Sequence, residues 1–219
     1  MEDIKRLIGD PALDYAIESL EQVIVGLPKV QEKLKILETA VTSLALRAGD
    51  DETIPEDSYG YIPLDMSEFF DCMFDLENAL ANDVDFADSD LRHRRVDFVE
   101  AGCGPGRNLF VLRATNRFEL RNVHGFDLSQ KQIEHGRNVF GLGDSIQHGD
   151  CFDFDFAPYD VVYFYRPLAN ADRECEFEER LVSQVKPGTY IIGCGNLTFG
   201  DDRRLLAKCE ASRLYKKLQ

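Results

Sequence analysis

The sequence predicts an α/β fold in which a doubly wound, mainly parallel sheet follows an N-terminal helical extension and ends in an antiparallel hairpin. From residue 96 onward, short apolar runs alternate with segments of helical character. Such alternation produces right-handed crossovers and a parallel sheet covered by helices on both faces. The composition agrees, because 44% of the 219 residues are hydrophobic and 30% are charged, which is typical of a globular domain with a full core.

Residues 1–48 are expected to be the helical extension. Two sets of apolar residues repeat a 4-3-4-3 spacing on either side of Pro28: Leu13, Ile17, Leu20, Ile24 and Leu27, then Val30, Leu34, Leu37, Val41 and Leu44. A seam of this kind needs an apolar partner along its length. Two heptads do not decide between a cap on the following domain and the interface of a homodimer.

Residues 49–219 are expected to form one domain. Residues 49–60 are acidic and contain Gly and Pro, which predicts a loop, and a helix is expected over 65–81. The expected strands span residues 96–99, 122–126, 144–147, 161–165 and 190–194, and the expected helices between them span 109–115, 129–140 and 175–185. Residues 205–210 and 213–218 are expected to pair as two antiparallel strands.

A glycine-rich turn follows the first expected strand. The strand runs directly into Glu100-Ala101-Gly102-Cys103-Gly104-Pro105-Gly106 and then into a helix. Glycine allows positive φ angles and a close approach of a ligand to the main chain. The amino end of the helix favours an anionic ligand group. Such a turn alone is typical of many nucleotide-binding proteins.

The following strands end in carboxylates at matching positions. Asp127 ends the second strand, 21 positions after Gly106, and a carboxylate there can accept both hydroxyls of an adenosine ribose. Asp150 ends the third strand and can accept from the exocyclic amine of adenine, while Phe152 or Leu128 covers a ring face. Because parallel strands end at one edge of a sheet, these groups are expected to share a cleft.

In this order and spacing, the motifs of residues 94–194 resemble those of the class I, seven-strand, Rossmann-like methyltransferases that use S-adenosylmethionine. The matching segments are E-A-G-C-G-P-G (100–106), G-F-D-L-S (125–129), H-G-D-C-F (148–152), Y-D-V-V-Y-F-Y (159–165) and V-K-P-G-T-Y-I-I (185–192). The resemblance implies methyl transfer from S-adenosyl-L-methionine and a final hairpin, which residues 203–218 would supply. One departure is that the segment between Cys194 and Arg203 is short for the helix usually placed there.

The resemblance also implies roles for individual residues. Gly102, Gly104 and Gly106 would hold the methionine portion of the cofactor, and Glu100 would bind its amino group. Asp127 would bind the ribose and Asp150 the adenine. The expected cofactor-binding set is completed by Cys103, Leu128, Cys151 and Phe152.

Two further segments are candidates for completing the site. Tyr61 would lie near the sulfonium, which an aromatic face attracts, or would line the acceptor channel; the alternative is a tyrosine that packs a loop onto the domain. At the end of the fourth strand, Tyr165 and Arg166 are the candidate catalytic residues, and Arg166 would hold an acidic acceptor. The sequence indicates no general base.

The acceptor is expected to be a small molecule or a protein side chain. A net charge of −15 opposes binding to a phosphate backbone. The fourth strand ends in Y-F-Y-R-P-L rather than the N/D-P-P-Y signature of enzymes that methylate nucleobase amines. A catalytically silent scaffold that binds S-adenosylmethionine remains an alternative. A nicotinamide-dependent oxidoreductase is a weaker one, because Arg107 stands where the third glycine should fall and no Tyr-x-x-x-Lys is present.

The patterns of cysteine, histidine and apolar residues argue against a metalloprotein, a disulfide-rich protein and a membrane protein. The six cysteines form no C-x-x-C pair and the four histidines no ligand spacing, which predicts reduced thiols and no structural metal. The sequence contains no apolar run of the roughly 18–20 residues that span a bilayer, and residues 1–6 do not resemble the start of a signal peptide. A cytoplasmic protein without membrane attachment is therefore expected.

Overall fold

The computed structural model describes residues 35–36, 39–47, 55–88, 93–115, 118–195, 198–209 and 213–218. The chain divides into two compact units, residues 1–43 and 44–219. Most of the predicted helical extension, with its apolar seam and the homodimer it would form, lies outside the described residues. Residues 39–46 are helical. Among the described residues, no helix combines the length and apolar character needed to cross a membrane.

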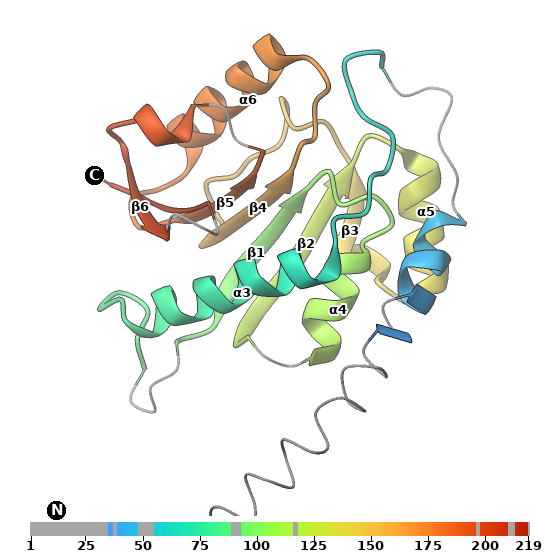
Figure 1. Ribbon diagram of the computed structural model, residues 1–219, viewed down its shortest axis with the longest axis horizontal. Coiled ribbons are helices and arrows are strands. Elements are labelled where there is room, and N and C mark those ends of the chain that lie inside the picture. Colours follow the sequence, from blue (N-terminus) through green and yellow to red (C-terminus); the bar gives the residue numbers. More distant parts are fainter. Residues whose placement is uncertain are drawn as a thin grey trace, which may run out of the picture. The chain divides into compact units, whose positions relative to one another are not determined.

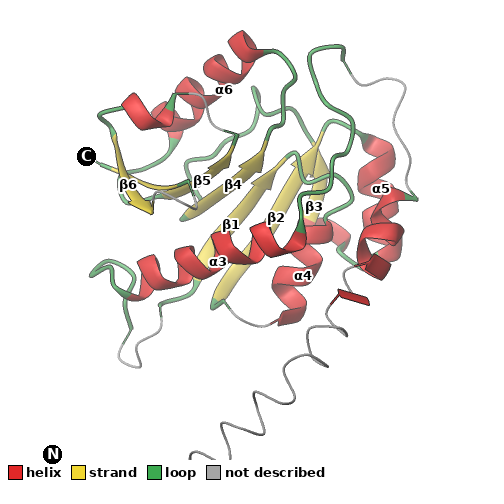
Figure 2. Ribbon diagram, in the orientation of Figure 1, coloured by secondary structure: helices red, strands yellow, loops and turns green. Residues whose placement is uncertain are grey.

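Seven strands of the described residues form one sheet with the order β3-β2-β1-β4-β5-β7-β6 (Figures 1 and 2). Their bounds are β1 (Val96–Ala101), β2 (Leu120–Asp127), β3 (Ile146–His148), β4 (Val161–Tyr165), β5 (Tyr190–Cys194), β6 (Leu205–Cys209) and β7 (Leu214–Lys217). Strands β1 to β5 pair in parallel, and β7 runs antiparallel to both β5 and β6. The predicted parallel sheet and its final antiparallel hairpin are confirmed.

Each predicted helix of the second unit is present. They are α3 (Met66–Ala81), α4 (Arg107–Thr115), α5 (Gln130–Val139) and α6 (Ala171–Gln184). Helix α6 begins earlier than the predicted residue 175, because Asn170 caps it by accepting from the backbone N–H groups of Asp172 and Arg173. Asp65 and Ser129 cap α3 and α5 in the same way.

The two faces of the sheet pack on different helices. One face and α6 share a core that includes Val99, Ala101, Val162, Phe164, Ile191, Phe177 and Leu181. Neighbouring residues of the same strands point the other way, so the ring of Tyr163 on β4 meets that of Phe69 on α3, with 5.5 Å between centroids. Figure 1 shows α3 running across the strands. The site at the carboxyl ends of the strands therefore rests on a sheet covered on both faces.

Two short connections form 3-10 turns. The third strand begins at Ile146 rather than residue 144, because residues 144 and 145 belong to a 3-10 turn, η1 (Gly143–Ser145). Between β5 and β6, the short connection holds only a 3-10 turn, η2 (Phe199–Asp201), among its described residues. Phe199 of that turn is buried against Phe164, so a single turn anchors the hairpin.

Candidate functional site

The glycine turn between β1 and α4 adopts the backbone that its sequence predicted. Gly102, Gly104 and Gly106 have φ angles of +70°, +54° and +77°, a region that side chains disfavour. The carbonyl oxygen of Phe126 on β2 accepts hydrogen bonds from the N–H groups of Gly102, at 3.0 Å, and Cys103, at 2.9 Å. The turn is thereby fixed to the end of the neighbouring strand.

The carboxylate of Asp127 connects this turn to the next helix. Its Oδ2 accepts from the N–H of Gly104 and its Oδ1 accepts from the N–H of Ser129, both at 2.8 Å. Each carboxylate oxygen can accept more than one hydrogen bond. Asp127 is therefore held in one orientation at the sheet edge and keeps capacity to bind hydroxyl groups there.

A buried acid lies beneath the turn. Asn108 donates from Nδ2 to Oε1 of Glu100 at 2.7 Å, whereas Oε2 of Glu100 has no hydrogen-bond partner. Burial raises the pKa of Glu100 to about 8, although the hydrogen bond from Asn108 opposes this. A buried polar oxygen without a partner costs free energy. The position therefore suits a ligand that brings a donor, above all a cationic one.

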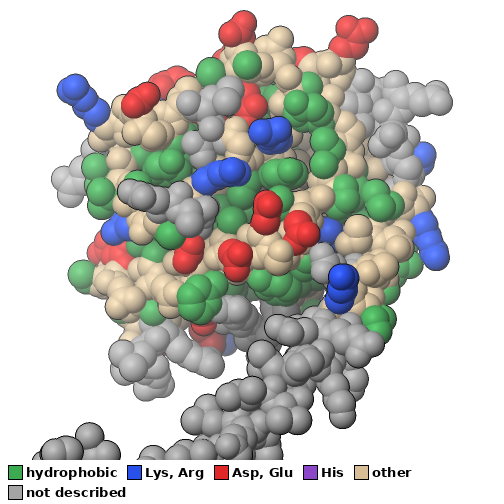
Figure 3. All heavy atoms as spheres, in the orientation of Figure 1, with side chains coloured by type: hydrophobic (Ala, Val, Ile, Leu, Met, Phe, Trp, Pro, Cys, Tyr) green, Lys and Arg blue, Asp and Glu red, His purple; other side chains and the backbone are tan. Residues whose placement is uncertain are grey.

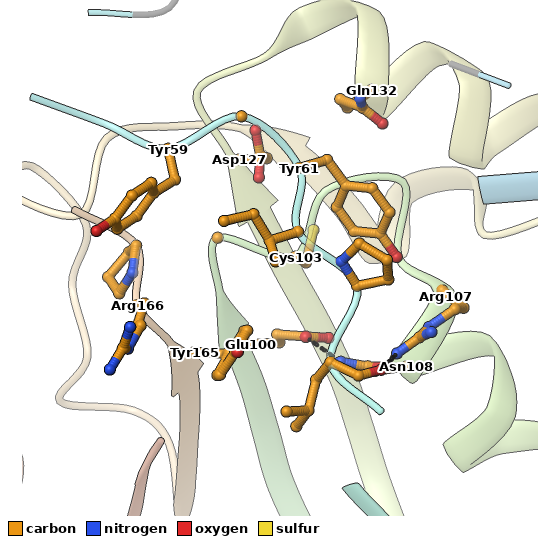
Figure 4. A pocket seen from close by; sticks show the side chains of 16 residues that line it. Tyr59, Tyr61, Glu100, Cys103, Arg107, Asn108, Asp127, Gln132, Tyr165 and Arg166 are labelled. Carbon is orange, nitrogen blue, oxygen red and sulfur yellow. Dashed lines mark hydrogen bonds between the residues drawn. The ribbon is translucent and has the colours of Figure 1, made fainter. Parts of the chain in front are cut away.

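Residues 59–64 form a roof over the glycine turn (Figure 4). The ring of Tyr61 lies against Gly104 so closely that a Cβ added to Gly104 would stand 2.2 Å from its Cδ2. Burial raises the pKa of Tyr61 well above its ordinary value. Arg107, at the start of α4, is buried and donates to the carbonyl oxygen of Leu64. The roof is thus fixed to the helix that follows the turn.

The roof and the strand ends enclose a cleft with two connected parts. The first part is lined by residues 59–64 and by Glu100, Gly102, Cys103, Arg107, Asn108, Asp127, Gln132, Tyr165, Arg166 and Pro167. The second is lined by Ser58, Tyr59, Gly102, Phe126, Asp127, Leu128, Gly149, Cys151, Pro167 and Leu168. Because Tyr59, Gly102, Asp127 and Pro167 belong to both, the two parts form one elongated site along the edge of the sheet.

Some of the predicted site residues do not line this cleft. A Cβ on Gly106 would meet Leu142 at 2.4 Å, so this glycine permits close packing of the turn on the structure behind it. The side chain of Asp150 accepts from the N–H of Phe152 at 2.8 Å. The ring of Phe152 lies under the guanidinium group of Arg173, 3.8 Å from its Cζ. Gly104 is covered by the roof.

At the far end of β4, Tyr165 and Arg166 do line the cleft. Arg166 has a φ of +40°, which is uncommon for a residue with a side chain and is typical of strained backbone at functional sites. Its side chain lies over the backbone of Gly195, where an added Cβ would stand 2.5 Å from Cγ of Arg166. Its N–H donates to the carbonyl oxygen of Cys194 at 3.2 Å.

A second buried acid lies near Arg166 and was missed in the sequence. Glu174 is only 7% exposed and its Oε1 has no hydrogen-bond partner. Burial and the neighbouring Glu178 together raise the pKa of Glu174 to about 7, although Arg166 opposes both. The sequence does contain a signal for a buried acid here, because Glu174 and Glu178 lie on the same face of α6 as the apolar residues Phe177 and Leu181.

Other lining residues were also missed. Asn108 and Arg107 follow the glycine turn, and Arg107 was considered only as an argument against nicotinamide binding. A positively charged residue at the amino end of a helix is unfavourable by itself, and this is the signal that Arg107 has a buried partner elsewhere. Gln132 also lines the cleft, with no comparable pattern in the sequence, whereas Tyr59 and Pro167 lie in the two segments that were expected to complete the site.

The strand order, the glycine turn after β1 and the carboxylate at the end of β2 together define a class I, Rossmann-like domain of the kind that binds an adenosyl ligand. Residues 98–188 match the family model described as methyltransferase domain. This stretch, 91 of the 219 residues, is therefore similar to a methyltransferase domain. No curated protein matches the chain.

Several solved structures resemble the chain at low identity. An RNA methyltransferase from Salinibacter ruber, in complex with S-adenosyl-L-homocysteine, is 18% identical with a TM-score of 0.45, over 72% of this chain and 92% of that one. An S-adenosylmethionine-dependent methyltransferase from Clostridium acetobutylicum is 18% identical with a TM-score of 0.43, over 59% and 50%. A phosphoethanolamine N-methyltransferase from Haemonchus contortus is 24% identical with a TM-score of 0.38, over 46% and 22%. The chain thus spans half or less of the last two.

Proposed function

We propose that the protein transfers a methyl group from S-adenosylmethionine to a small molecule or protein side chain that carries an acidic group. The use of this methyl donor is supported most directly by the placement of two carboxylates, Glu100 and Asp127, on either side of the glycine turn. Glu100 presents a buried carboxylate oxygen without a partner, and Asp127 presents a carboxylate that is fixed by two backbone N–H groups.

The residues of the cleft fit the methyl donor. Glu100 would bind its amino group, because an ammonium supplies both the hydrogen-bond donor and the positive charge that a buried carboxylate lacks. Asp127 would bind the ribose hydroxyls, and Leu128 and Cys151 line the part of the cleft beyond it. When bound, the donor supplies an electrophilic methyl group on a positively charged sulfur.

The roof supports the transfer in two ways. It shields the glycine turn from water, and exclusion of water strengthens the electrostatic contacts inside the site. Tyr61 lies against Gly104 and offers an aromatic face to a sulfonium. The same contact means that this ring must shift before any ligand reaches the backbone of Gly104. Alignment of the acceptor with the methyl group is then the main requirement for rate.

Arg166 is the residue that favours an acidic acceptor. It lies at the end of β4, lines the cleft and is exposed, and its guanidinium group has neither a hydrogen bond nor an ion pair with the part of the chain that the structure describes. A guanidinium group binds carboxylate and phosphate groups bidentately. Tyr165, immediately before it, would contact the acceptor on the same side of the cleft.

Nucleic acid is not proposed as the acceptor. The net charge of −15 opposes binding to a phosphate backbone, which depends on clustered Lys and Arg. On the face drawn in Figure 3, Lys and Arg side chains are scattered among acidic and hydrophobic ones. A single guanidinium at the cleft suits one acidic group rather than an extended polyanion.

The proposal is tested in two steps with the full chain. Calorimetric titration should give binding of S-adenosylmethionine and S-adenosylhomocysteine, with no heat for NADH. Transfer of a labelled methyl group should then be measured with panels of amino acids, phosphorylated and carboxylated metabolites, and peptides. Donor binding without turnover on any acceptor would favour the catalytically silent scaffold instead, and no donor binding would overturn both.

A further inference from the structure

Two thiols from distant parts of the chain meet beneath the acceptor end of the cleft. The Sγ atoms of Cys72, on α3, and Cys194, at the end of β5, are 3.7 Å apart. Both residues are buried. No disulfide joins any of the six cysteines in the part of the chain that the structure describes.

We propose that Cys72 and Cys194 are an oxidisable pair that forms a disulfide with hydrogen peroxide, and that this bond controls the acceptor end of the site. A disulfide requires the two sulfurs to approach by about 1.7 Å, because an S–S bond is about 2.0 Å long. Such a shift is small for two side chains, one on a helix and one at a strand end.

The surroundings of the two sulfurs assign their roles. The hydrogen bond with Cys72 lowers the pKa of Cys194, and the positive charge of Arg213 acts in the same direction. The same hydrogen bond, together with burial, raises the pKa of Cys72. We take Cys194 as the thiol that attacks first, since the thiolate is the reactive form. The products are the same with the roles exchanged, because either sulfur can donate in this contact.

The reaction balances with peroxide as the only oxidant. The Cys194 thiolate attacks one peroxide oxygen, the O–O bond breaks, and hydroxide leaves to take up a proton, which gives a sulfenic acid on Cys194. The sulfur of Cys72 then attacks the sulfur of Cys194, loses its proton and displaces the second oxygen as water. In total, two thiols and one hydrogen peroxide give one disulfide and two waters.

The pair is coupled to the site through the backbone of Cys194. The carbonyl oxygen of Cys194 accepts from the N–H of Arg166, and Gly195, the next residue, lies under the side chain of Arg166. Pulling the Cys194 side chain toward α3 therefore changes the support of Arg166. Cys72 and Cys194 are not among the residues that line the cleft, whereas Glu100 and Asp127 are, so oxidation should alter use of the acceptor more than binding of the donor.

The test uses the full chain treated with hydrogen peroxide and then digested without reduction. Mass spectrometry should find the peptides of Cys72 and Cys194 joined, with the loss of two hydrogen atoms, in more than half of the protein. Dithiothreitol should reverse the link. The thermal midpoint of the oxidised protein should rise by roughly 5 °C, a result that does not depend on catalytic activity.

Matched variants separate the pair from general thiol oxidation. Cys72→Ser and Cys72→Ala should each abolish both the link and the rise in thermal midpoint, and circular dichroism of the reduced variants shows whether they fold. Cys175→Ser, which changes a half-buried thiol on α6, should leave both unchanged. Sulfinic acid at Cys194 without the link, or a link between other cysteines, would overturn the proposal.

Discussion

Asn108 holds one oxygen of Glu100 and leaves the other without a partner: its Nδ2 donates to Oε1 at 2.7 Å, while Oε2 has no hydrogen bond. The half-satisfied carboxylate is also protonated more readily than usual, since burial raises its pKa to about 8. A cationic ligand group and a proton therefore compete for the same buried acid.

This competition predicts pH-dependent binding of the donor. Below pH 8, Glu100 is protonated and must lose a proton to bind an ammonium, so affinity should rise with pH by up to about tenfold per unit and level off near pH 8. Calorimetry with S-adenosylhomocysteine from pH 6 to 9 measures this. Glu100→Gln should bind more weakly at pH 8.5 and show a flatter profile. An equally steep profile in that variant would place the titrating group elsewhere.

Replacing Asp127 should weaken donor binding strongly. Asp127→Ala removes hydrogen bonds to a charged group worth about 1.5–3 kcal/mol, so the dissociation constant should rise by about 10- to 100-fold. Asp150→Ala is the matched comparison, because Asp150 also ends a strand segment but does not line the cleft, and its effect should be smaller. Equal losses in both variants would mean that adenine reaches Asp150 directly.

Arg166→Ala should raise KM for an acidic acceptor by at least about tenfold, which is the loss expected for one charge-assisted contact. The dissociation constant of the donor should stay within about twofold. Arg121→Ala, which removes a guanidinium paired with Asp97 at the start of the strands, is the control and should change neither constant. An unchanged KM in Arg166→Ala would remove this residue from the acceptor site.

Glu174 should make the protein less stable as pH rises. Its pKa in the folded protein is about 7, above its ordinary value of 4.5, so its contribution is complete below pH 4.5 and is lost as pH rises through 7. Glu174→Gln should therefore match the parent near pH 5 and exceed its free energy of unfolding by about 1–3 kcal/mol at pH 8.5. Urea unfolding of both proteins checks this.

The control for Glu174 is Glu176→Gln, because Glu176 lies on the same helix with its side chain 59% exposed. It should change the free energy of unfolding by less than about 0.5 kcal/mol at either pH. A gain of similar size in both variants would trace the effect to the net charge of the protein rather than to the buried acid.

Gly136 on α5 should tolerate no side chain. A Cβ there would lie 2.1 Å from the carbonyl oxygen of Pro105 in the glycine turn, so Gly136→Ala should lower the free energy of unfolding by about 1–3 kcal/mol. Gly200→Ala adds the same methyl group where no atom lies within 4 Å and should have little effect. Thermal unfolding of the two variants makes the comparison, and equal midpoints would contradict the packing argument.

The sheet could be predicted from the sequence because the signals that specify its strands and helices are local. Alternating apolar runs, the caps at Asp65 and Ser129, and the positive-φ glycines of the turn act within a few residues of one another. The carboxylate of Asp127 bonds to Gly104, 23 positions away, but the place of Asp127 at a strand end follows from the local pattern of its own strand. The third strand begins two residues later than predicted because Gly143 starts a 3-10 turn. The pattern of short apolar runs does not reveal such a turn.

The remaining parts of the site depend on contacts between distant segments. Arg107 meets the carbonyl oxygen of Leu64 across 43 positions of the chain, and a charged residue after a glycine turn does not specify such a partner. Spacing placed Asp150 at a strand end but could not show that its side chain would cap the following turn. The meeting of Cys72 with Cys194 likewise requires the fold.

The roof over the glycine turn also determines what can be removed from the chain. The family match begins at residue 98, whereas Tyr59 and Tyr61 stand well before it and the hairpin β6–β7 lies after its end. A fragment trimmed to residues 98–188 would keep Glu100 and Asp127 but expose the backbone of Gly104 to solvent. It would also lack β5, β6 and β7, which leaves β4 as an uncovered edge of the sheet. Truncations intended for crystallisation or binding screens should therefore start no later than residue 55 and retain the last strand.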